Sequence, residues 1–364
     1  MNITLVEPFF SGSHKQWAEG LVKHSAHNFF LASLPGRHWK WRMHGGAVTL
    51  ADKVNHERRP DLILATDMLD VSTFRGLLKR GFRDIPIVTY FHENQLTYPW
   101  SPDDQDVKLK RDTHYAFINY TSALASDKVV FNSNYHKSSF LDSLPEFLNL
   151  FPDYQDVIRI DEIARKSTVL PIGLELSKFD GFKKVKKNKV PVIVWNHRWE
   201  YDKNPGLFLK GLNILKNNKI DFQLVLLGEG FKKSPKEFEQ IQEDFGKELV
   251  HVGFVETFDE YAHLLSQGDI LPITSVQDFF GISAVEGAYS GAQPILPQRL
   301  AFPEVFDFEN NKSLFYNTDE EFVEMLADRV SNAPQNKFKN SELLKYDWTK
   351  LIPKYDHFFE ECLK

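Results

Sequence analysis

Short apolar runs alternate with amphipathic segments along the first half of the chain. The apolar runs, which predict β-strands, cover residues 3–6, 28–31, 62–65, 87–91 and 128–132. Apolar residues that recur every three or four positions predict helices over residues 17–24, 72–80 and 112–125. Strands without a polar face, separated by helices, are typical of a parallel sheet that is covered on both sides. This half therefore predicts a doubly wound α/β domain.

A second series with the same alternation follows. Its predicted strands cover residues 192–195, 222–228, 249–254, 270–273 and 293–296, and its predicted helices cover residues 205–216, 235–245 and 258–267 together with one helix around residue 286. The two series predict two Rossmann-like domains. The lysine run within residues 183–189 is typical of a solvated linker. We expect an N-terminal domain over residues 1–172, a linker over 173–190, a C-terminal domain over 191–335 and a final segment over 336–364.

Composition narrows the class of protein further. The 364 residues suffice for two domains, and 42% hydrophobic and 26% charged residues describe a soluble globular protein. The chain contains no apolar run near the roughly 18 residues that span a bilayer, and it opens on a strand pattern instead of a secretory leader. Its single cysteine, Cys362, fits a reducing compartment. We therefore expect a cytoplasmic protein that does not act at a membrane.

The net charge of −6 argues against a generic nucleic-acid binder. Acidic and basic residues are equal in number over residues 1–170, however, so the whole excess of acidic residues lies in the remainder. A polyanionic partner is therefore expected on the N-terminal half.

Two acidic residues of the second half, Asp278 and Glu286, flank a glycine turn at Gly281. A glycine just before a helix lets backbone N–H groups approach an anion, and the helix dipole favours negative charge there. Glu286 would lie about one turn inside that helix, where its carboxylate can accept hydrogen bonds from sugar hydroxyls. Upstream, Arg198 and Lys203 follow the strand over residues 192–195 and can neutralise a diphosphate without a metal. The pattern predicts a nucleotide-sugar site.

This arrangement resembles the retaining glycosyltransferases of family 4, which have a GT-B fold of two Rossmann-like domains facing a central cleft. The resemblance implies that Arg198 and Lys203 bind the donor diphosphate, that Asp278 contacts the transferred sugar and that Glu286 contacts the ribose. Asp278 departs from the family pattern, which has a glutamate there. The further donor-binding residues that the resemblance implies are Gly12, Phe280, Gly281 and Ile282. In GT-B enzymes the last helix crosses back to the first domain, and we expect this of residues 346–363.

Polar motifs follow two predicted strands of the first half. Residues 11–15, Ser-Gly-Ser-His-Lys, predict a flexible loop, although a single glycine among serines is also an ordinary turn. Residues 92–95, His-Glu-Asn-Gln, follow the strand over residues 87–91, where ligands of such sheets bind. His92 could donate a hydrogen bond to the sugar, and Glu93 could orient it or contact the acceptor. The alternative is a histidine with a purely structural role.

Residues 38–42, His-Trp-Lys-Trp-Arg, interleave two tryptophans with basic side chains. Such a segment can stack on nucleobases and neutralise phosphates. The alternative is a strand edge on which Trp39 and Trp41, two positions apart, pack on one face.

Longer strings carry a closer resemblance over nearly the whole chain. The strings that are similar to the tRNA-queuosine α-mannosyltransferase family cover residues 12–15, 38–42, 91–99, 130–134, 195–203, 279–281 and 302–306. The resemblance implies transfer of mannose from GDP-mannose to queuosine at the wobble position of tRNA-Asp, with retained configuration, no essential metal and no other cofactor. The residues that we expect on the acceptor side are His14, Lys15, Trp39, Lys40, Trp41, Arg42, Glu93, Asn94 and Gln95.

Two other functions stay open. The same chemistry could act on a glycan, lipid or small-metabolite acceptor, which the acidic net charge favours. A catalytically idle RNA-binding protein could also use this scaffold, but Arg198, Lys203 and Glu286 argue against it. A dinucleotide-dependent dehydrogenase is not expected, because no Gly-x-Gly-x-x-Gly follows a strand.

Overall fold

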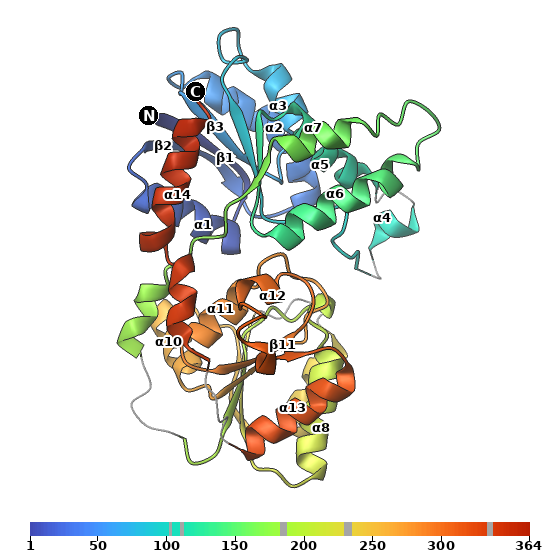
Figure 1. Ribbon diagram of the computed structural model, residues 1–364, viewed down its shortest axis with the longest axis vertical. Helices are drawn as coiled ribbons and strands as arrows, with labels where there is room; N and C mark the ends of the chain where they lie inside the picture. The colour runs from blue at the N-terminus through green and yellow to red at the C-terminus, as the bar shows by residue number, and fades with distance from the viewer. Residues whose placement is uncertain (102–103, 110–112, 183–187, 229–234, 333–337) are drawn as a thin grey trace. The chain divides into compact units, whose positions relative to one another are not determined.

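The computed structural model describes residues 1–101, 104–109, 113–182, 188–228, 235–332 and 338–364 (Figure 1). The chain forms two compact units, one of Met1–Glu175 with Tyr346–Lys364 and one of Leu176–Lys345. Each unit contains a six-stranded sheet whose strand pairs are all parallel. The predicted α/β class is therefore confirmed. None of the helices in the described ranges is long and apolar enough to span a bilayer.

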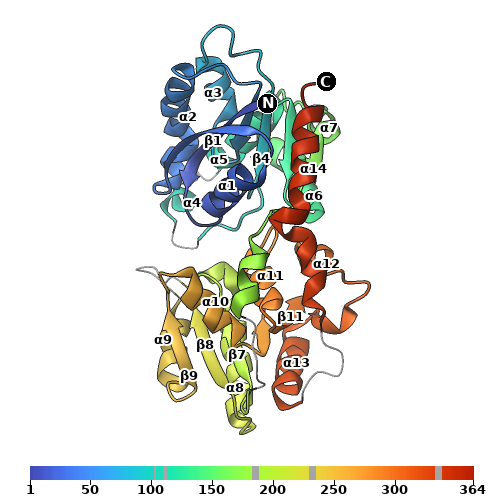
Figure 2. The same ribbon diagram turned by 90° about the vertical axis from the view of Figure 1, so that its left-hand side faces the viewer.

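The sheet of unit 1 has the strand order β2-β1-β3-β4-β5-β6. Its strands are β1 (Asn2–Phe10), β2 (Asn28–Pro35), β3 (Leu62–Thr66), β4 (Ile87–Phe91), β5 (Lys128–Phe131) and β6 (Ser167–Val169). Every residue of β3 and β4 is buried, as their unbroken apolar runs predict. Helices α1 and α14 lie against each other, and α2, α3 and α5 form another group, as Figures 1 and 2 show.

The helices of unit 1 are α1 (Gly12–His24), α2 (Trp39–Asn55), α3 (Val71–Leu77), α4 (Gln105–Lys108), α5 (Thr113–Ala125), α6 (Asn134–Leu148), α7 (Arg159–Arg165) and α14 (Trp348–Glu361). The flexible loop expected over residues 11–15 is wrong, because β1 continues to Phe10 and residues 12–15 belong to α1, which begins at Gly12 with a φ of +50°. The strand edge considered for residues 38–42 is wrong, because Trp39 opens helix α2. Two consecutive glycines lower the helix propensity of α2 and hide it from the pattern.

The C-terminal helix α14 packs on α1 within unit 1. The Tyr355 hydroxyl accepts a hydrogen bond from Trp17 Nε1 (3.2 Å) and donates to the Pro171 carbonyl (2.8 Å). Trp348, at the start of α14, lies so close to two glycines that a Cβ at Gly20 would be 2.0 Å from its ring. The close approach fixes the helix, because any larger residue at position 20 would push it away.

We predict that Tyr355→Phe destabilises unit 1 by about 1 to 3 kcal/mol, because the buried Trp17 Nε1 loses its hydrogen-bond acceptor. The urea midpoint of unfolding, followed by tryptophan fluorescence, measures the change. Tyr154→Phe is the matched control, since the Tyr154 side chain is exposed and its loss of a hydroxyl should leave the midpoint unchanged. Equal midpoints for wild type and Tyr355→Phe would contradict the prediction.

The sheet of unit 2 has the strand order β12-β11-β10-β7-β8-β9. Its strands are β7 (Val192–Trp195), β8 (Gln223–Leu227), β9 (Leu249–Gly253), β10 (Ile270–Pro272), β11 (Gln293–Pro297) and β12 (Phe315–Tyr316). Its helices are α8 (Pro205–Asn217), α9 (Lys236–Asp244), α10 (Phe258–Ser266), α11 (Ile282–Tyr289), α12 (Phe302–Val305) and α13 (Asp319–Ser331). A core of apolar side chains from β7, β8, α8 and α13 lies on one face of this sheet.

Short 3₁₀ helices complete the fold: η1 (Leu176–Phe182), η2 (Tyr201–Lys203), η3 (Lys312–Leu314) and η4 (Asn340–Tyr346). The η1 segment lies in the region expected as a linker, but Leu176 and Phe179 are buried. An apolar residue every third position gives this segment a side that packs, and it contacts α10 and α11. The lysine run over residues 183–187 lies outside the described residues.

Candidate active site

In unit 2, the loops after β7 and β10 meet at a buried ammonium group. The Lys203 Nζ lies 3.0 Å from Asp202 Oδ2 and 3.1 Å from Asp278 Oδ2, and it donates to the Gln277 carbonyl (3.0 Å). Burial lowers the pKa of Lys203, but the two carboxylates outweigh it, so its pKa is raised and the ammonium stays charged. The structure thus brings together two of the predicted catalytic residues.

Arg198 follows β7 by three residues and lies on the surface of the same loop. Its Nη2 is 3.3 Å from Glu200 Oε2, and its side chain is 54% exposed. A planar guanidinium with an exposed edge can bind phosphate oxygens in a bidentate manner. Arg198 and Lys203 therefore offer one accessible and one buried positive charge on one loop.

Glu286 projects from α11 and is held by a tyrosine that the sequence did not indicate. The Tyr261 hydroxyl donates to Glu286 Oε2 (2.8 Å), and Asn196 Nδ2 donates in turn to the Tyr261 oxygen (3.3 Å). Burial raises the pKa of Glu286 to about 7, against the opposing effect of the Tyr261 hydrogen bond. The Oε1 atom accepts no hydrogen bond from the described residues, so it can accept one from a ligand hydroxyl.

The predicted glycine turn is present at the start of α11. Gly281 has a φ of +87°, and a Cβ there would lie 2.6 Å from the Phe302 ring. Ile282 opens the helix and is partly exposed, whereas the Phe280 side chain is only 3% exposed and packs in the core. Backbone N–H groups at this turn can therefore bind an anion, while the buried Phe280 side chain anchors the turn to the core.

A hydrogen bond joins the α11 turn to the loop after β7. The Ser283 Oγ lies 2.7 Å from His197 Nδ1. Burial and the nearby Lys203 lower the pKa of His197 to about 3, so this imidazole is neutral. Gly228, after β8, allows the close approach of the same loop, because a Cβ there would lie 2.1 Å from the His197 carbonyl. His197 and Gly228 were not singled out from the sequence.

Unit 1 holds a second group of buried polar residues at the carboxyl ends of β1, β3 and β4. His14 Nδ1 lies 3.1 Å from Glu7 Oε2, and the rings of His14 and His92 are 4.2 Å apart. The His92 backbone N–H donates to Asp67 Oδ1 (2.8 Å). Burial lowers the pKa of His14, but the charge and hydrogen bond of Glu7 raise it to about 9. His14 is therefore an imidazolium at neutral pH.

His92 has the opposite protonation state. Burial, followed by the charges of His14 and His136, holds its pKa well below the usual range. Its Nε2 is buried and has no hydrogen-bond partner among the described residues. A neutral imidazole with one unused nitrogen can hydrogen-bond a hydroxyl of a ligand.

Glu7, His14 and His92 also have the spacing of metal ligands, since one ligand atom from each lies within 4.8 Å of the others. Two of these atoms already form the ion pair between Glu7 and His14. The group can therefore hold a cation only if His14 loses its proton. No other group in the described ranges has this spacing.

The residues after His92 mainly stabilise their own turn. Asn94 Oδ1 accepts hydrogen bonds from the backbone N–H groups of Leu96 and Thr97, each at 3.0 Å. Gln95 Nε2 donates to Glu93 Oε1 (3.0 Å). Of the three residues predicted on the acceptor side here, Glu93 is partly exposed, whereas Asn94 and Gln95 are buried.

The other residues predicted on the acceptor side lie near the amino ends of α1 and α2. Lys15 is exposed on α1, as is Gly12, which was predicted on the donor side. Lys40 forms ion pairs with Asp104 and Asp106. Trp39 and Trp41 lie in the first turn of α2, and their side chains point to different sides of the helix. Arg42 Nε donates to the Pro35 carbonyl (3.2 Å).

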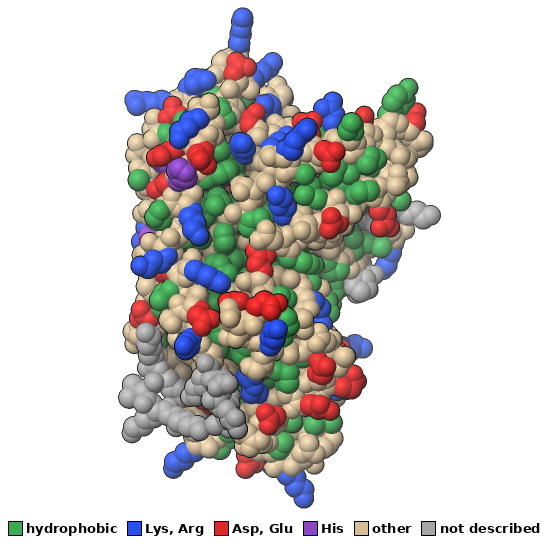
Figure 3. All heavy atoms as spheres, in the orientation of Figure 1, with side chains coloured by type: hydrophobic (Ala, Val, Ile, Leu, Met, Phe, Trp, Pro, Cys, Tyr) green, Lys and Arg blue, Asp and Glu red, His purple; other side chains and the backbone are tan. Residues whose placement is uncertain are grey.

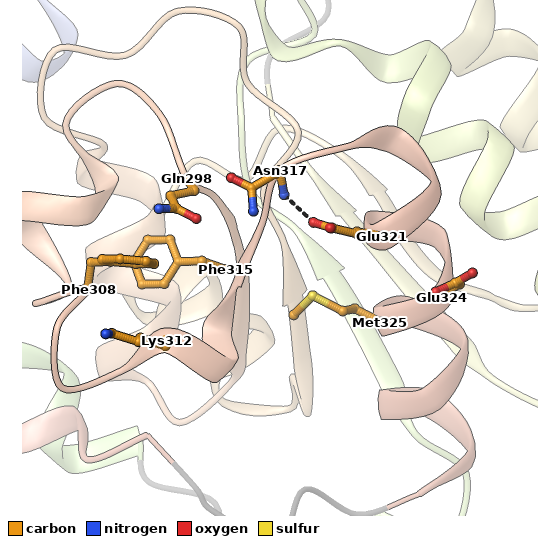
Figure 4. Close-up of a pocket in the computed structure, with 8 residues that line it drawn as sticks. All are labelled: Gln298, Phe308, Lys312, Phe315, Asn317, Glu321, Glu324 and Met325. Carbon is orange, nitrogen blue, oxygen red and sulfur yellow. Dashed lines mark hydrogen bonds between the residues drawn. The ribbon is translucent and has the colours of Figure 1, made fainter.

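A surface pocket of about 360 Å³ in unit 2 is lined by residues from the loop after β11, from β12 and from α13 (Figure 4). Phe308 and Phe315 pack edge to face in it, with ring centroids 5.1 Å apart, and Glu321 accepts a hydrogen bond from the Asn317 backbone. A second pocket, of about 760 Å³, lies between α5 and the α6–α7 connection in unit 1. Neither contains a residue of the predicted site.

Family comparisons agree with this division into units. Residues 2–174 match the family model described as tRNA-queuosine alpha-mannosyltransferase N-terminal, and residues 177–342 match that of glycosyl transferases group 1. A tRNA-queuosine alpha-mannosyltransferase of Drosophila melanogaster is 33% identical over 375 residues, which cover 99% of this chain and 97% of the relative.

Solved structures with low sequence identity share the fold. The Candida albicans trehalose-6-phosphate phosphatase N-terminal domain has a TM-score of 0.72 and 14% identity, covering 100% of this chain and 96% of that one. An alpha,alpha-trehalose-phosphate synthase from Burkholderia xenovorans has a TM-score of 0.67 and 11% identity, with full coverage of both chains. The architecture and the site define a glycosyltransferase of the GT-B class. Within that class, the chain belongs to the tRNA-queuosine alpha-mannosyltransferase family.

We predict that the stability of unit 1 falls between pH 6.5 and pH 9. The folded pKa of His14, about 9, exceeds its ordinary value of 6.5, so the stabilisation is complete below pH 6.5 and is lost as the pH rises through 9. The pKa of Asp67, which burial raises to about 8, acts in the same direction. Glu7→Gln should reduce this loss by on the order of 2 kcal/mol, because it removes the carboxylate that keeps His14 protonated.

Urea midpoints at pH 6.5 and pH 9 provide the measurement. Glu19→Gln is the control, since Glu19 forms only an exposed ion pair with Lys15. If the wild type and Glu7→Gln lose the same stability over this range, the protonated state assigned to His14 is incorrect.

Proposed function

We propose that this protein transfers mannose from GDP-mannose to a hydroxyl of queuosine at the wobble position of tRNA-Asp, with retention of the anomeric configuration. The observation that carries the proposal is the full-length relationship to the Drosophila melanogaster tRNA-queuosine alpha-mannosyltransferase. The geometry of unit 2 supports it, because two cations, a glycine turn and two carboxylates occur together at the carboxyl ends of its strands.

In this proposal, Arg198 and Lys203 neutralise the diphosphate as it leaves. The backbone N–H groups at the start of α11 bind the same phosphates, and Glu286 binds the ribose hydroxyls through Oε1. Asp278 is shorter than the glutamate of the family pattern, and its Oδ2 is bonded to Lys203. Its other oxygen is the one that would contact the transferred mannose.

The bond between the mannose anomeric carbon and the donor phosphate breaks with its electron pair on the phosphate oxygen. The acceptor hydroxyl attacks from the same face, and its proton passes to that phosphate oxygen. No side chain of the protein becomes bonded to the sugar. His92 would stabilise the transferred mannose by a hydrogen bond from its unused ring nitrogen. The two cations supply the charge neutralisation that a divalent metal supplies in other transferases.

The competing acceptor classes are glycans, lipids and small metabolites. They share the donor chemistry of unit 2, so only the acceptor distinguishes them. The family match of residues 2–174 favours the tRNA acceptor, because this part of the chain matches a family model specific to tRNA-queuosine alpha-mannosyltransferase.

We predict that radiolabelled GDP-mannose transfers its label to tRNA-Asp that carries queuosine and leaves tRNA-Asp with guanosine at the wobble position unlabelled. Radiolabelled UDP-glucose in place of radiolabelled GDP-mannose is the donor control and should give no labelled tRNA. Label on neither tRNA, with GDP-mannose hydrolysed, would reject the tRNA acceptor and leave a glycosyltransferase with another acceptor.

We predict that Arg198→Ala lowers kcat about 100-fold or more, because one of the two charges on the leaving diphosphate is lost. Arg198→Lys should retain part of the activity, since it keeps the charge but loses the bidentate geometry. Lys210→Ala is the control, because Lys210 is exposed on α8 and forms a surface ion pair with Glu320 of α13. Wild-type turnover of Arg198→Ala, with the thermal midpoint unchanged, would remove Arg198 from the diphosphate site.

A further inference from the structure

Trp39 and Trp41 lie in the first turn of α2, where their side chains have different surroundings. Trp39 packs against Trp100 and Tyr115, with ring centroids 6.1 and 5.0 Å away. Trp41 is 65% exposed, although tryptophan side chains are usually mostly buried. Its indole therefore offers a large aromatic surface to solvent.

Gly45, one helical turn after Trp41, determines how the indole lies. A Cβ at residue 45 would be 2.5 Å from Trp41 Cε2 and Cζ2 and 3.0 Å from Nε1. The ring therefore covers the position that a side chain would occupy, with one side against the helix and the other open to solvent. Only glycine at position 45 permits this orientation.

The charge of the neighbouring residue Lys40 is more than balanced by its ion pairs with Asp104 and Asp106. The next cations along the chain are Arg37, which is exposed just before α2, and Arg42, which follows Trp41 and is partly exposed. The first turn of α2 contains no acidic residue. The local charge around Trp41 therefore suits a polyanion, even though the chain as a whole is acidic.

The loop that precedes α2 lies beside the turn that leads to the polar group of unit 1. The loop that leads into α2 packs on the turn that leads into α1, because a Cβ at Gly36 would lie 2.0 Å from Ser11 Oγ. His14 follows this turn, two residues after Gly12. Both loops follow the carboxyl ends of neighbouring strands, β1 and β2, where ligands of parallel sheets bind. Figure 3 shows Lys and Arg side chains scattered among Asp and Glu side chains on the face of unit 1 that it draws.

We infer that the exposed face of Trp41 is a stacking platform for an unpaired nucleobase of the RNA acceptor, and that Arg37 and Arg42 neutralise the phosphates beside that base. The inference rests on the proposed tRNA acceptor and deepens it. It assigns base stacking to Trp41 alone and gives Trp39 and Lys40 structural roles. An indole held on a helix by Gly45 loses little conformational freedom on binding, so stacking contributes to affinity without a large entropic cost.

Three substitutions test the platform in the full-length protein. Trp41→Ala should raise the KM for tRNA about tenfold and leave kcat and the KM for GDP-mannose unchanged. Trp41→Phe should retain part of the affinity, because a smaller ring still stacks. Gly45→Ala should raise the KM for tRNA without touching the tryptophan itself, since its Cβ displaces the indole. Alanine also favours a helix more than glycine does, so this variant should fold.

The salt dependence of binding separates stacking from phosphate contact. The affinity for fluorescent tRNA-Asp, measured at several salt concentrations, should fall with the wild-type slope for Trp41→Ala and with a smaller slope for Arg37→Ala. Tyr154→Ala, at the exposed aromatic of the α6–α7 connection, is the matched control and should bind as the wild type does.

Wild-type affinity of both Trp41→Ala and Gly45→Ala for tRNA would overturn the inference. Because binding is measured without transfer, the result does not depend on the donor. If the wild type binds tRNA but transfers mannose to none, the proposed function fails while the platform is still decided by the affinities. If the wild type does not bind tRNA, both are rejected.

Discussion

The candidate active site of unit 2 depends on one buried ammonium group. Lys203 cannot remain charged away from water without partners, and Asp202 and Asp278 are the groups that provide them. Backbone contacts strengthen the same junction, since Val276 N–H donates to the Asp202 carbonyl (2.8 Å) and Thr274 donates to the Lys203 carbonyl (2.7 Å). The loops after β7 and β10 are therefore joined at a fixed distance. Arg198 lies on one of them, and the other leads to the turn that begins α11.

Unit 1 contains two buried imidazoles with different protonation states. His14 and His92 lie in contact, yet burial and neighbouring charges set their pKa values in opposite directions. One ring takes a positive charge that Glu7 balances, and this charge helps to keep the other neutral. Adjacent residues of the same type therefore offer different chemistry. The positively charged imidazolium of His14 and the neutral, hydrogen-bonding imidazole of His92 thus lie side by side.

Local pattern located ten of the twelve strands in the described part of the chain, whereas the three-residue β6 and the two-residue β12 were not predicted. The strands over residues 87–91 and 192–195 have the predicted bounds, because unbroken apolar runs with polar ends leave little ambiguity. Helix α2 escaped prediction because glycines and aromatic residues weaken its periodicity. Tyr261 escaped because its partner Glu286 lies 25 residues away, and Glu7 escaped because it lies inside strand β1; only the fold reveals such pairs. The Asp278–Lys203 contact, across 75 residues, is of the same kind.

The family comparisons divide the chain according to the specificity of each match. Residues 177–342 match the model of glycosyl transferases group 1, whereas residues 2–174 match the model described as tRNA-queuosine alpha-mannosyltransferase N-terminal. The residues proposed to bind the donor, Arg198, Lys203 and Glu286, fall in the first range. Unit 1 is the part of the chain that the family model named for the tRNA acceptor matches. An exposed tryptophan held flat by a glycine is a specialised feature of that unit, because neither the sheet nor its core requires it.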